Sequence, residues 1–265
     1  MSAKIIAIEG LDAVGKNTQA FALRQKLLDL GYKASVFSWP NYKSESATFI
    51  TKYLNGEYPD NVSRKAICLL FAMDRFNTIY LDDDFKDMIE DKDFVIFDRY
   101  VASNIICQCG LLEKEIVGGY IHIPGSVPEF DENKANMLRH AKFDLANWIY
   151  TTEHHDLGIP VPDVTVYLDL NPDTAFELLK ARAEEDSRTI DVHETLENQI
   201  LFYKSFQFVD RIYPDLYKVD CNMPDIKSST EFNKRIRSIE DISADIFDIV
   251  KKKLIDKQLI YTCIH

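Results

Sequence analysis

The chain has 265 residues, 46% of them hydrophobic, which is enough for one large domain with a substantial core or for two small ones, and we expect a single domain over residues 1–265. Its formal net charge of −12 argues against a non-specific binder of nucleic acid or of a membrane surface, because either would need a basic face. No run reaches the ~18 apolar residues of a membrane span and no basic-then-apolar leader opens the chain, so we expect a cytoplasmic protein.

The strongest local pattern lies at the start of the chain. A β-branched run from Lys4 to Ile8 predicts a buried strand, a glycine-bounded loop follows at residues 10–18, and Thr18–Leu30 has the pattern of a helix. The spacing Gly-x4-Gly-Lys is the Walker A pattern, in which backbone N–H groups surround an anion at a helix N-terminus. Because strand, loop and helix occur in the required order, we expect the loop to bind phosphate and Lys16 to reach the β- and γ-phosphates of a nucleotide.

Strands and helices alternate along the rest of the chain. We expect strands at Lys33–Ser38, Phe94–Phe97, Val164–Leu170 and Lys218–Asp220. We expect helices at Ala47–Leu54, Ser63–Leu81, Ala102–Leu112, Asn133–His155, Thr174–Ala183, Thr195–Ile212 and Ile239–Leu254. This alternation is typical of an α/β fold in which a parallel sheet is flanked by helices on both faces.

Asp98 and Arg99 follow one of these strands directly. In parallel sheets ligands bind beyond the carboxyl ends of the strands, so the pair is expected on the same side as the Walker A loop. Asp98 offers a carboxylate for Mg2+ or its waters, and Arg99 offers a fork for a second phosphate. A second interpretation has equal weight here: the pair caps the next helix and forms surface ion pairs.

Two further groups allow either a functional or an ordinary interpretation. The charged segment at residues 184–194 is either a solvated loop, the commoner case, or a hinged lid whose arginines close over a phosphoryl group. Phe71 and Arg75 lie at i and i+4, where they either stack on a flat base and donate to its carbonyl or form a core Phe with a surface Arg. Asn104 is likewise either a base reader or a surface residue.

Taken in order, these motifs resemble those of the thymidylate kinases. The resemblance covers residues 1–220 and rests on the segments Ile8–Asp12, Gly15–Gln19, Trp39–Tyr42, Leu70–Arg75, Asp98–Asn104 and Gly158–Asp163. It implies a P-loop nucleoside monophosphate kinase fold with a five-stranded parallel sheet and a lid segment. Along the single domain it implies, in order, a phosphate loop at 10–18, an acceptor-side segment at 39–62, an insertion at about 113–135, a lid at about 182–194 and an insertion at about 222–235. The roles of the two insertions stay open.

The activity that the resemblance implies is transfer of the γ-phosphoryl group of ATP to dTMP, which yields dTDP and ADP in pyrimidine deoxynucleotide synthesis. Mg2+ is the expected cofactor, bound with ATP, and the candidate protein ligands are Asp12 and Asp98. ATP and dTMP are the expected partners, with no nucleic acid and no membrane. The resemblance also suggests a homodimer formed through the long helices, including Ser63–Leu81 and the helix that begins near Ala102.

The site residues are those that match the family motifs. Catalysis is assigned to Lys16, Arg99, Asp12, Arg182 and Arg188. ATP binding is assigned to Gly10, Leu11, Asp12, Ala13, Val14, Gly15, Lys16, Asn17 and Thr18. Binding of dTMP is assigned to Asp12, Trp39, Pro40, Tyr42, Phe71, Arg75, Arg99, Ser103, Asn104, Cys107, Gln108, His193 and Glu194.

The resemblance also implies individual roles at the acceptor. Arg99 lies between the donor and acceptor phosphates, and Phe71 stacks on the thymine while Arg75 and Asn104 read its polar edge. Tyr42 touches the acceptor phosphate.

Near the transferred group, Asp12 contacts the acceptor sugar hydroxyl or Mg2+. The lid arginines Arg182 and Arg188 supply positive charge, because Ala13 stands where some family members carry a catalytic arginine.

Three departures from the family pattern keep alternatives open. Asn17 replaces the residue whose hydroxyl usually binds Mg2+, which leaves the ion to ATP, water and a nearby carboxylate, or to the amide oxygen. Cys107 stands where a bulky aromatic often lies near the sugar 2′ carbon, so discrimination against ribonucleotides would be relaxed, and His193-Glu194 replaces a Tyr-Glu pair. The alternatives are a kinase for dUMP or a modified deoxyuridylate, and a nucleotide-binding protein with impaired catalysis.

Overall fold

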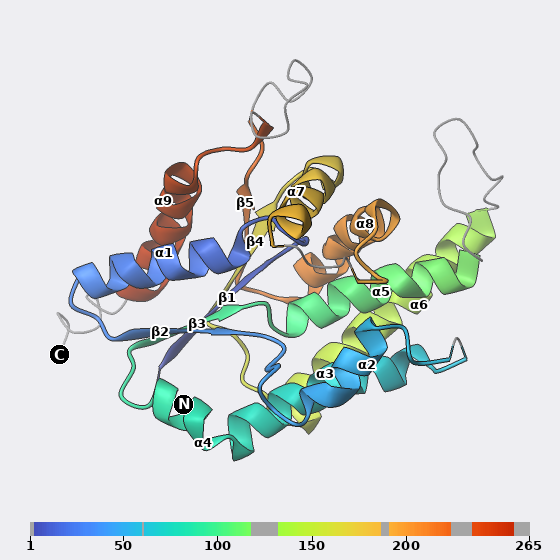
Figure 1. The fold of residues 1–265 in the computed structure, drawn as a ribbon, viewed down its shortest axis with the longest axis horizontal. Coiled ribbons are helices and arrows are strands. Elements are labelled where there is room, and N and C mark those ends of the chain that lie inside the picture. Colours follow the sequence, from blue (N-terminus) through green and yellow to red (C-terminus); the bar gives the residue numbers. More distant parts are fainter. Residues whose placement is uncertain (1–2, 60, 118–131, 187–190, 224–234, 257–265) are drawn as a thin grey trace.

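The computed structural model describes residues 3–59, 61–117, 132–186, 191–223 and 235–256. Its centre is one sheet of five parallel strands in the order β2-β3-β1-β4-β5 (Figure 1). The strands are β1 Lys4–Gly10, β2 Ala34–Ser38, β3 Phe94–Asp98, β4 Val164–Asp169 and β5 Leu216–Asp220. The predicted parallel sheet is therefore confirmed, and its parallel strands place all five carboxyl ends along one edge.

The central strands are covered on both faces. Every residue of β4 is buried, and so is every residue of β1 after the first, with no alternation between buried and exposed positions. Such continuous burial requires helices on both sides of a sheet. Helix α1 Lys16–Asp29 packs on β1, β2 and β3 and against α9 Ile239–Val250, whereas α5 Val101–Val117 packs on β1 and against α8 Leu196–Ile212.

The remaining helices pack mainly on other helices rather than on the strands. They are α2 Ala47–Leu54, α3 Arg64–Leu81, α4 Asp83–Ile89, α6 Glu132–Tyr150 and α7 Pro172–Glu185. The sequence patterns did not indicate α4, a short helix whose one buried side chain is Phe85 and whose N-cap carboxylate, on Asp82, accepts a hydrogen bond from Phe85 N at 2.9 Å. None of the helices in the described part of the chain is long and apolar enough to cross a membrane.

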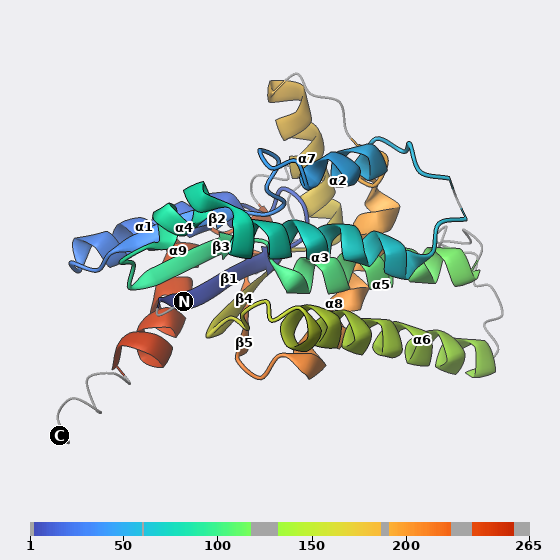
Figure 2. The same cartoon turned by 90° about the horizontal axis from the view of Figure 1, so that it is seen from below.

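Helices α3, α5 and α6 lie side by side beyond the sheet edge (Figure 2). The contact between α5 and α8 is especially close at Gly110, where an added Cβ would lie 2.6 Å from Cδ1 of Phe202. That distance is shorter than any ordinary contact, so a residue without a side chain is needed at this position. The glycine thus allows Phe202 to approach the region where α3 and α5 meet.

The predicted helix at Asn133–His155 is divided into two parts. Helix α6 ends at Tyr150, and the π-helical turn η1 Thr151–Asp156 continues it; a similar turn, η3 Lys251–Ile255, follows α9. Turns of this kind are rare and are frequent at functional sites. The sequence periodicity does not reveal the change of helix type, because both forms bury residues at similar spacings.

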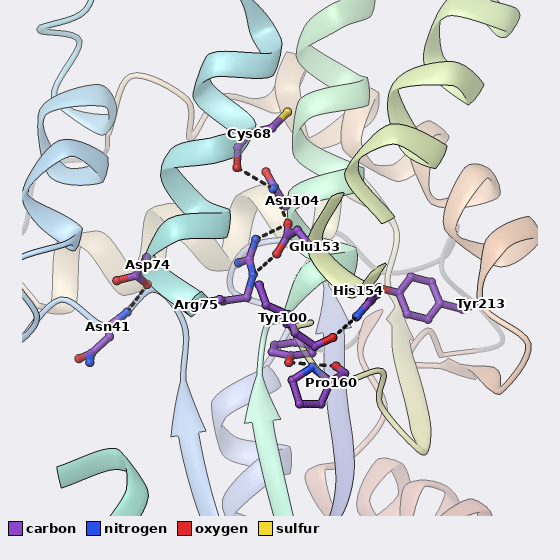
Figure 3. A network of polar contacts seen from close by, with 11 residues as sticks. Asn41, Cys68, Asp74, Arg75, Tyr100, Asn104, Glu153, His154, Pro160 and Tyr213 are labelled. Carbon is purple, nitrogen blue, oxygen red and sulfur yellow. Dashed lines mark hydrogen bonds and ion pairs between the residues drawn. The ribbon is translucent and has the colours of Figure 1, made fainter. Parts of the chain in front are cut away.

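A buried histidine anchors η1. Because the carbonyl oxygen of Ile159 can only accept, His154 Nδ1 donates to it at 2.8 Å, and Nε2 then accepts from the Tyr213 hydroxyl at 2.8 Å. The side chain is therefore neutral, and burial lowers the pKa of His154 to about 4. Figure 3 shows this contact beside Glu153, the preceding residue of η1.

The depressed pKa of His154 predicts a pH dependence of stability. Between the ordinary histidine pKa of 6.5 and a value of about 4, the unfolded chain binds a proton that the folded chain does not, so stability falls as the pH falls through this window. From pH 7.5 to pH 5 we expect His154 to remove about 2 kcal/mol from the free energy of unfolding. Urea unfolding at both values should show that His154→Gln lowers this loss by about that amount. An equal loss in both proteins would contradict the assignment.

Candidate active site

The phosphate loop begins where β1 ends at Gly10 and finishes where α1 begins at Lys16. Gly15 is the N-cap residue, has a φ of 90° and offers no side-chain cap, so the first backbone N–H groups of α1 are left for a ligand. At Gly10, where φ is 152°, an added Cβ would lie 3.0 Å from the carbonyl oxygen of Leu168. The loop thus has the backbone geometry that the Walker A pattern predicts.

Lys16 is buried beneath this loop. Its Nζ donates to the carbonyl oxygens of Leu11 at 2.5 Å and Gly10 at 3.2 Å. Burial, together with the cation of Arg99, lowers the pKa of Lys16 to about 8. Phosphate oxygens beside the ammonium group would favour its charged form.

Arg99, Asp12 and Gln199 form a cluster next to the loop. Arg99 Nη2 forms an ion pair with Asp12 Oδ1, and Gln199 Nε2 donates to Asp12 Oδ2 at 2.8 Å. Gln199 Oε1 also accepts from the backbone N of Asp12 at 3.2 Å. Burial alone would raise the pKa of Asp12, but Arg99 and Lys16 lower it to about 2. Asp12 therefore stays charged and holds the guanidinium in place.

The backbone at Arg99 is itself unusual. Its φ of 66° lies in the left-handed region, which residues other than glycine rarely adopt, and its backbone N donates to Ile8 O at 3.0 Å. This conformation aims the chain from the end of β3 toward the phosphate loop. The interpretation of Arg99 as a helix cap on the surface is therefore wrong.

A cavity opens beside this cluster, between the acceptor-side segment, α3, α5 and the start of α8. Its wall is formed by Asp12, Trp39, Pro40, Tyr42, Tyr53, Leu54, Phe71, Arg75, Arg99, Tyr100, Ser103, Asn104, Cys107, Leu111, Asp191, His193, Glu194 and Phe202. All residues that the resemblance assigned to dTMP are brought together here except Gln108. The side chain of Gln108 is turned away and accepts from Arg64 Nη1 at 3.0 Å.

The acceptor-side segment is tied to α3 by a buried carboxylate. Asp74 accepts from the backbone N of Asn41 at 2.9 Å and from Ser46 Oγ at 2.8 Å. These bonds fix the chain on both sides of Tyr42, whose side chain is exposed at the cavity mouth.

Arg75 and Asn104 lie at the opposite end of the cavity. Neither is on the surface: their exposed fractions are 3% and 4%. Both contact the carboxylate of Glu153. It accepts hydrogen bonds from Arg75 Nε at 2.5 Å, Arg75 Nη2 at 2.6 Å and Asn104 Nδ2 at 2.8 Å. The surface interpretation of both residues is therefore wrong, and Phe71 is a half-buried part of the wall rather than a core residue.

The segment between α7 and α8 reaches the cavity through its last residues. Asp191, His193 and Glu194 are in the wall, and the ring of His193 stacks on Tyr53 with centroids 4.6 Å apart. Burial lowers the pKa of His193 to about 4. This end of the segment is therefore packed rather than a solvated loop.

Of the two predicted lid arginines, the structure describes Arg182, which is not part of the wall. Arg182 lies in the last turn of α7, is exposed, and has its Nε 3.5 Å from Oδ2 of Asp186. Arg188 lies outside the described residues, as does most of each predicted insertion.

Oxygen atoms suited to Mg2+ gather at the ends of β2 and β3. Ser38 Oγ donates to Asp98 Oδ2 at 3.2 Å and accepts from Asn17 Nδ2 at 3.2 Å. Mg2+ prefers such hard oxygen ligands and usually takes only one or two carboxylates besides substrate phosphates. Within the described ranges no three His, Cys, Asp or Glu side chains form a metal-binding group. The oxygens of Asp98 and Ser38 are of the kind that fits an ion bound chiefly by substrate phosphates. Both oxygens of Asp12 are already engaged, which favours Asp98 of the two predicted ligands.

Several wall residues were not among those predicted to bind a substrate. They are Tyr53, Leu54, Tyr100, Leu111, Asp191 and Phe202. Most are apolar and follow the same periodicity as core residues, so only the packing of α2, α5 and α8 distinguishes them. Gln199 and Glu153 were missed for a different reason: each contacts a residue far away in the chain.

Comparison with known proteins gives a consistent result. The family model described as "Thymidylate kinase" matches residues 8–117. A thymidylate kinase from Mycobacterium tuberculosis is 30% identical over 184 residues, which are 69% of this chain and 73% of that protein. One from Thermoanaerobacter pseudethanolicus is 26% identical over 257 residues, 96% of this chain and 100% of that protein. A solved thymidylate kinase structure from Candida albicans aligns with a TM-score of 0.58 at 20% identity and covers 95% of this chain and 92% of its own.

The hydrogen bonds of Gln199 predict a measurable contribution to stability. Gln199→Ala removes two bonds of a buried side chain and leaves the backbone N and Oδ2 of the half-buried Asp12 without these partners. We expect the free energy of unfolding, measured with urea, to fall by about 1–3 kcal/mol. Gln207→Ala on the same helix is the control, because the exposed bond of Gln207 Nε2 to Lys204 O should contribute within about 0.5 kcal/mol. Equal effects of the two substitutions would contradict the role of Gln199.

Proposed function

The chain belongs to the thymidylate kinase family, and we propose how its site performs the reaction of that family, the transfer of the γ-phosphoryl group of ATP to dTMP with formation of dTDP and ADP. The observation that carries the proposal is the cluster of Lys16, Asp12 and Arg99 at the point where the phosphate loop meets the cavity. It provides two cations where two phosphorylated substrates would meet.

The donor nucleotide binds at the phosphate loop. The free N–H groups at the start of α1 surround its phosphates, and Lys16 exchanges its contacts with Gly10 and Leu11 for phosphate oxygens. This exchange needs only a small movement of Lys16 Nζ, because both of its carbonyl partners belong to the loop that would surround the phosphates.

The acceptor binds in the cavity. Its base lies between Phe71 and the polar pair Arg75 and Asn104, and its phosphate lies near Tyr42 and Arg99. A guanidinium already held by Asp12 needs little rearrangement when charge develops on the transferred group, which is the condition for electrostatic stabilisation of a transition state. No covalent intermediate with the protein is required.

Asp98 would hold Mg2+ together with the ATP phosphates, with the hydroxyl oxygen of Ser38 close by. When bound, the ion neutralises phosphate charge. Arg182 and Arg188 remain the proposed lid arginines, which act only if the segment before residue 191 closes over the site. A cytoplasmic location stays a prediction from the sequence.

A substrate panel tests the function. ADP production is measured with ATP and Mg2+ and with dTMP, dUMP, UMP, dCMP or AMP as acceptor, and we expect dTMP to be preferred. Lys16→Ala should stay folded, as judged by circular dichroism, and should lose at least about a hundredfold in turnover, the magnitude typical of one preorganised donor.

Other results of the panel would change the assignment. Preference for another pyrimidine would shift attention to Cys107, and turnover of UMP close to that of dUMP would support relaxed sugar discrimination at this small side chain. Silence with every acceptor despite nucleotide binding would favour a binding protein, and full turnover of Lys16→Ala would contradict the role of Lys16.

We also propose a homodimer formed through the long helices. Support comes from exposed apolar side chains along one stripe of α3, namely Leu69, Met73 and Tyr80. Light scattering should give a mass of twice the chain mass of 30.6 kDa. Met73→Asp should lower the measured mass. Phe21→Asp is the control, because Phe21 is an exposed apolar residue on α1, and it should leave the mass unchanged. A single-chain mass for the unmodified protein would contradict the proposal.

A further inference from the structure

Glu153 is a fully buried carboxylate that contacts Arg75 and Asn104 of the cavity wall without being part of the wall itself. It lies in η1, is 1% exposed, and both of its oxygens accept hydrogen bonds from residues that do form the wall (Figure 3). Oε2 accepts from Arg75 Nε, and Oε1 accepts from both Arg75 Nη2 and Asn104 Nδ2. One side chain therefore holds the two residues proposed to read the base.

The contacts of Asn104 fix the direction of its amide group. Nδ2 donates to Glu153 Oε1 at 2.8 Å and to the backbone carbonyl oxygen of Cys68 at 3.1 Å. A carboxylate and a carbonyl can only accept, so the NH2 end must face them, and reversing the amide would place its oxygen against two other oxygens. The orientation of the Asn104 amide therefore follows from the two acceptors that face it.

This orientation leaves an acceptor for a ligand. Asn104 Oδ1 is buried and has no partner among the described residues. Such an atom normally has a hydrogen bond in a folded protein, so its lack of a partner calls for an explanation. Because Asn104 belongs to the wall, a donor group of a bound ligand can supply the missing bond.

Arg75 places donors beside this acceptor. Its Nε and Nη2 are held by Glu153, and Nη1 of the same rigid fork has no bond to another described side chain or carbonyl. Burial alone would lower the pKa of Arg75, but the neighbouring Glu153 carboxylate raises it above its ordinary value, so the donors are permanent. The protein thus presents a donor next to an acceptor.

Pyrimidine bases differ in this pattern. Thymine and uracil offer a carbonyl acceptor at position 4 and an N–H donor at position 3, whereas cytosine offers an amino donor at position 4 and an acceptor at position 3. The acceptor and donor of thymine and uracil match the Arg75 donor and the Asn104 acceptor. In cytosine, the amino donor would face the Arg75 donor and the ring acceptor would face the Asn104 acceptor.

We propose that Glu153 is a positioning residue that sets base specificity, because it holds Arg75 as a donor and Asn104 as an acceptor toward 4-oxo pyrimidines and against cytosine. This inference rests on the proposed function, in which the acceptor base lies at this end of the cavity. The bond of His154 to Ile159 and Tyr213 contributes by fixing η1, and with it the backbone of Glu153.

The test compares two substitutions at one position. Glu153→Gln replaces one carboxylate oxygen by an amino group. In place of Oε2 this group faces Arg75 Nε and one bond is lost, whereas in place of Oε1 it faces both Arg75 Nη2 and Asn104 Nδ2, so two bonds are lost and the bond that holds the amide of Asn104 to Glu153 is gone. Glu153→Asp keeps two acceptors on a shorter side chain. Values of kcat and KM are measured for dTMP and dCMP with saturating ATP, at a temperature where circular dichroism shows each variant folded.

We expect Glu153→Gln to raise the KM of dTMP at least tenfold, to change kcat less, and to lower the preference in kcat/KM for dTMP over dCMP at least fivefold. Glu153→Asp should raise the KM of dTMP but keep the preference. Glu113→Gln is the matched control: Glu113 forms a largely buried ion pair with Lys142 Nζ at 2.6 Å away from the cavity, and its loss should leave both the KM and the preference unchanged.

The outcomes separate the two proposals. An unmodified protein that does not phosphorylate dTMP overturns the proposed function. If the unmodified protein prefers dTMP and folded Glu153→Gln keeps both its KM and its preference, only the role of Glu153 is overturned. Should Glu153→Gln fail to fold, an unchanged KM of dTMP in Glu153→Asp would overturn the inference in the same way.

Discussion

The site depends on holding two cations, Lys16 and Arg99, close together without a bound anion. Like charges so near each other in a partly dry site repel strongly, and burial adds a further cost. Asp12 offsets both, since its carboxylate pairs with Arg99 and lies within the field of Lys16. The pKa of Lys16 is still lowered, first by burial and then by Arg99, so the compensation is incomplete. In the proposed reaction the phosphates of a substrate would complete it.

At the end of the cavity proposed to bind the base, the ion pair between Arg75 and Glu153 has a different role. A buried pair such as Arg75 and Glu153 contributes little net stability, because desolvation of two charges cancels most of their attraction. The pair instead fixes the orientation of the side chains that bond to Glu153. Every hydrogen bond to the side chain of Glu153 is donated by a residue of the wall. The carboxylate therefore fixes the position of both a donor, on Arg75, and an acceptor, on Asn104. In the proposed function the end that binds phosphate needs charge and the end that binds the base needs orientation, and the ion pairs at the two ends fit these different purposes.

The parts that the sequence predicted are those with local patterns. The parallel strands follow from continuous β-branched runs, and the phosphate loop follows from glycine spacing between a strand and a helix. The acceptor-side residues came from the ordered motifs of a family. What could not be predicted are partners far apart in the chain: Glu153 lies 78 residues from Arg75, and Gln199 lies 187 residues from Asp12. An isolated Glu or Gln in a helical pattern looks like any surface residue, so only the packing of η1 and α8 reveals these roles.

The contact between Gln199 and Asp12 also links the two halves of the site. Asp191, His193 and Glu194 are in the cavity wall, Thr195 caps α8 through its bond from Asn198 N, and Gln199 lies one turn later. A rigid helical turn thus connects the segment between α7 and α8 to the carboxylate that holds Arg99. Because Gln199 is hydrogen-bonded to Asp12 and Asp12 pairs with Arg99, the position of the first turn of α8 is linked to the position of the guanidinium.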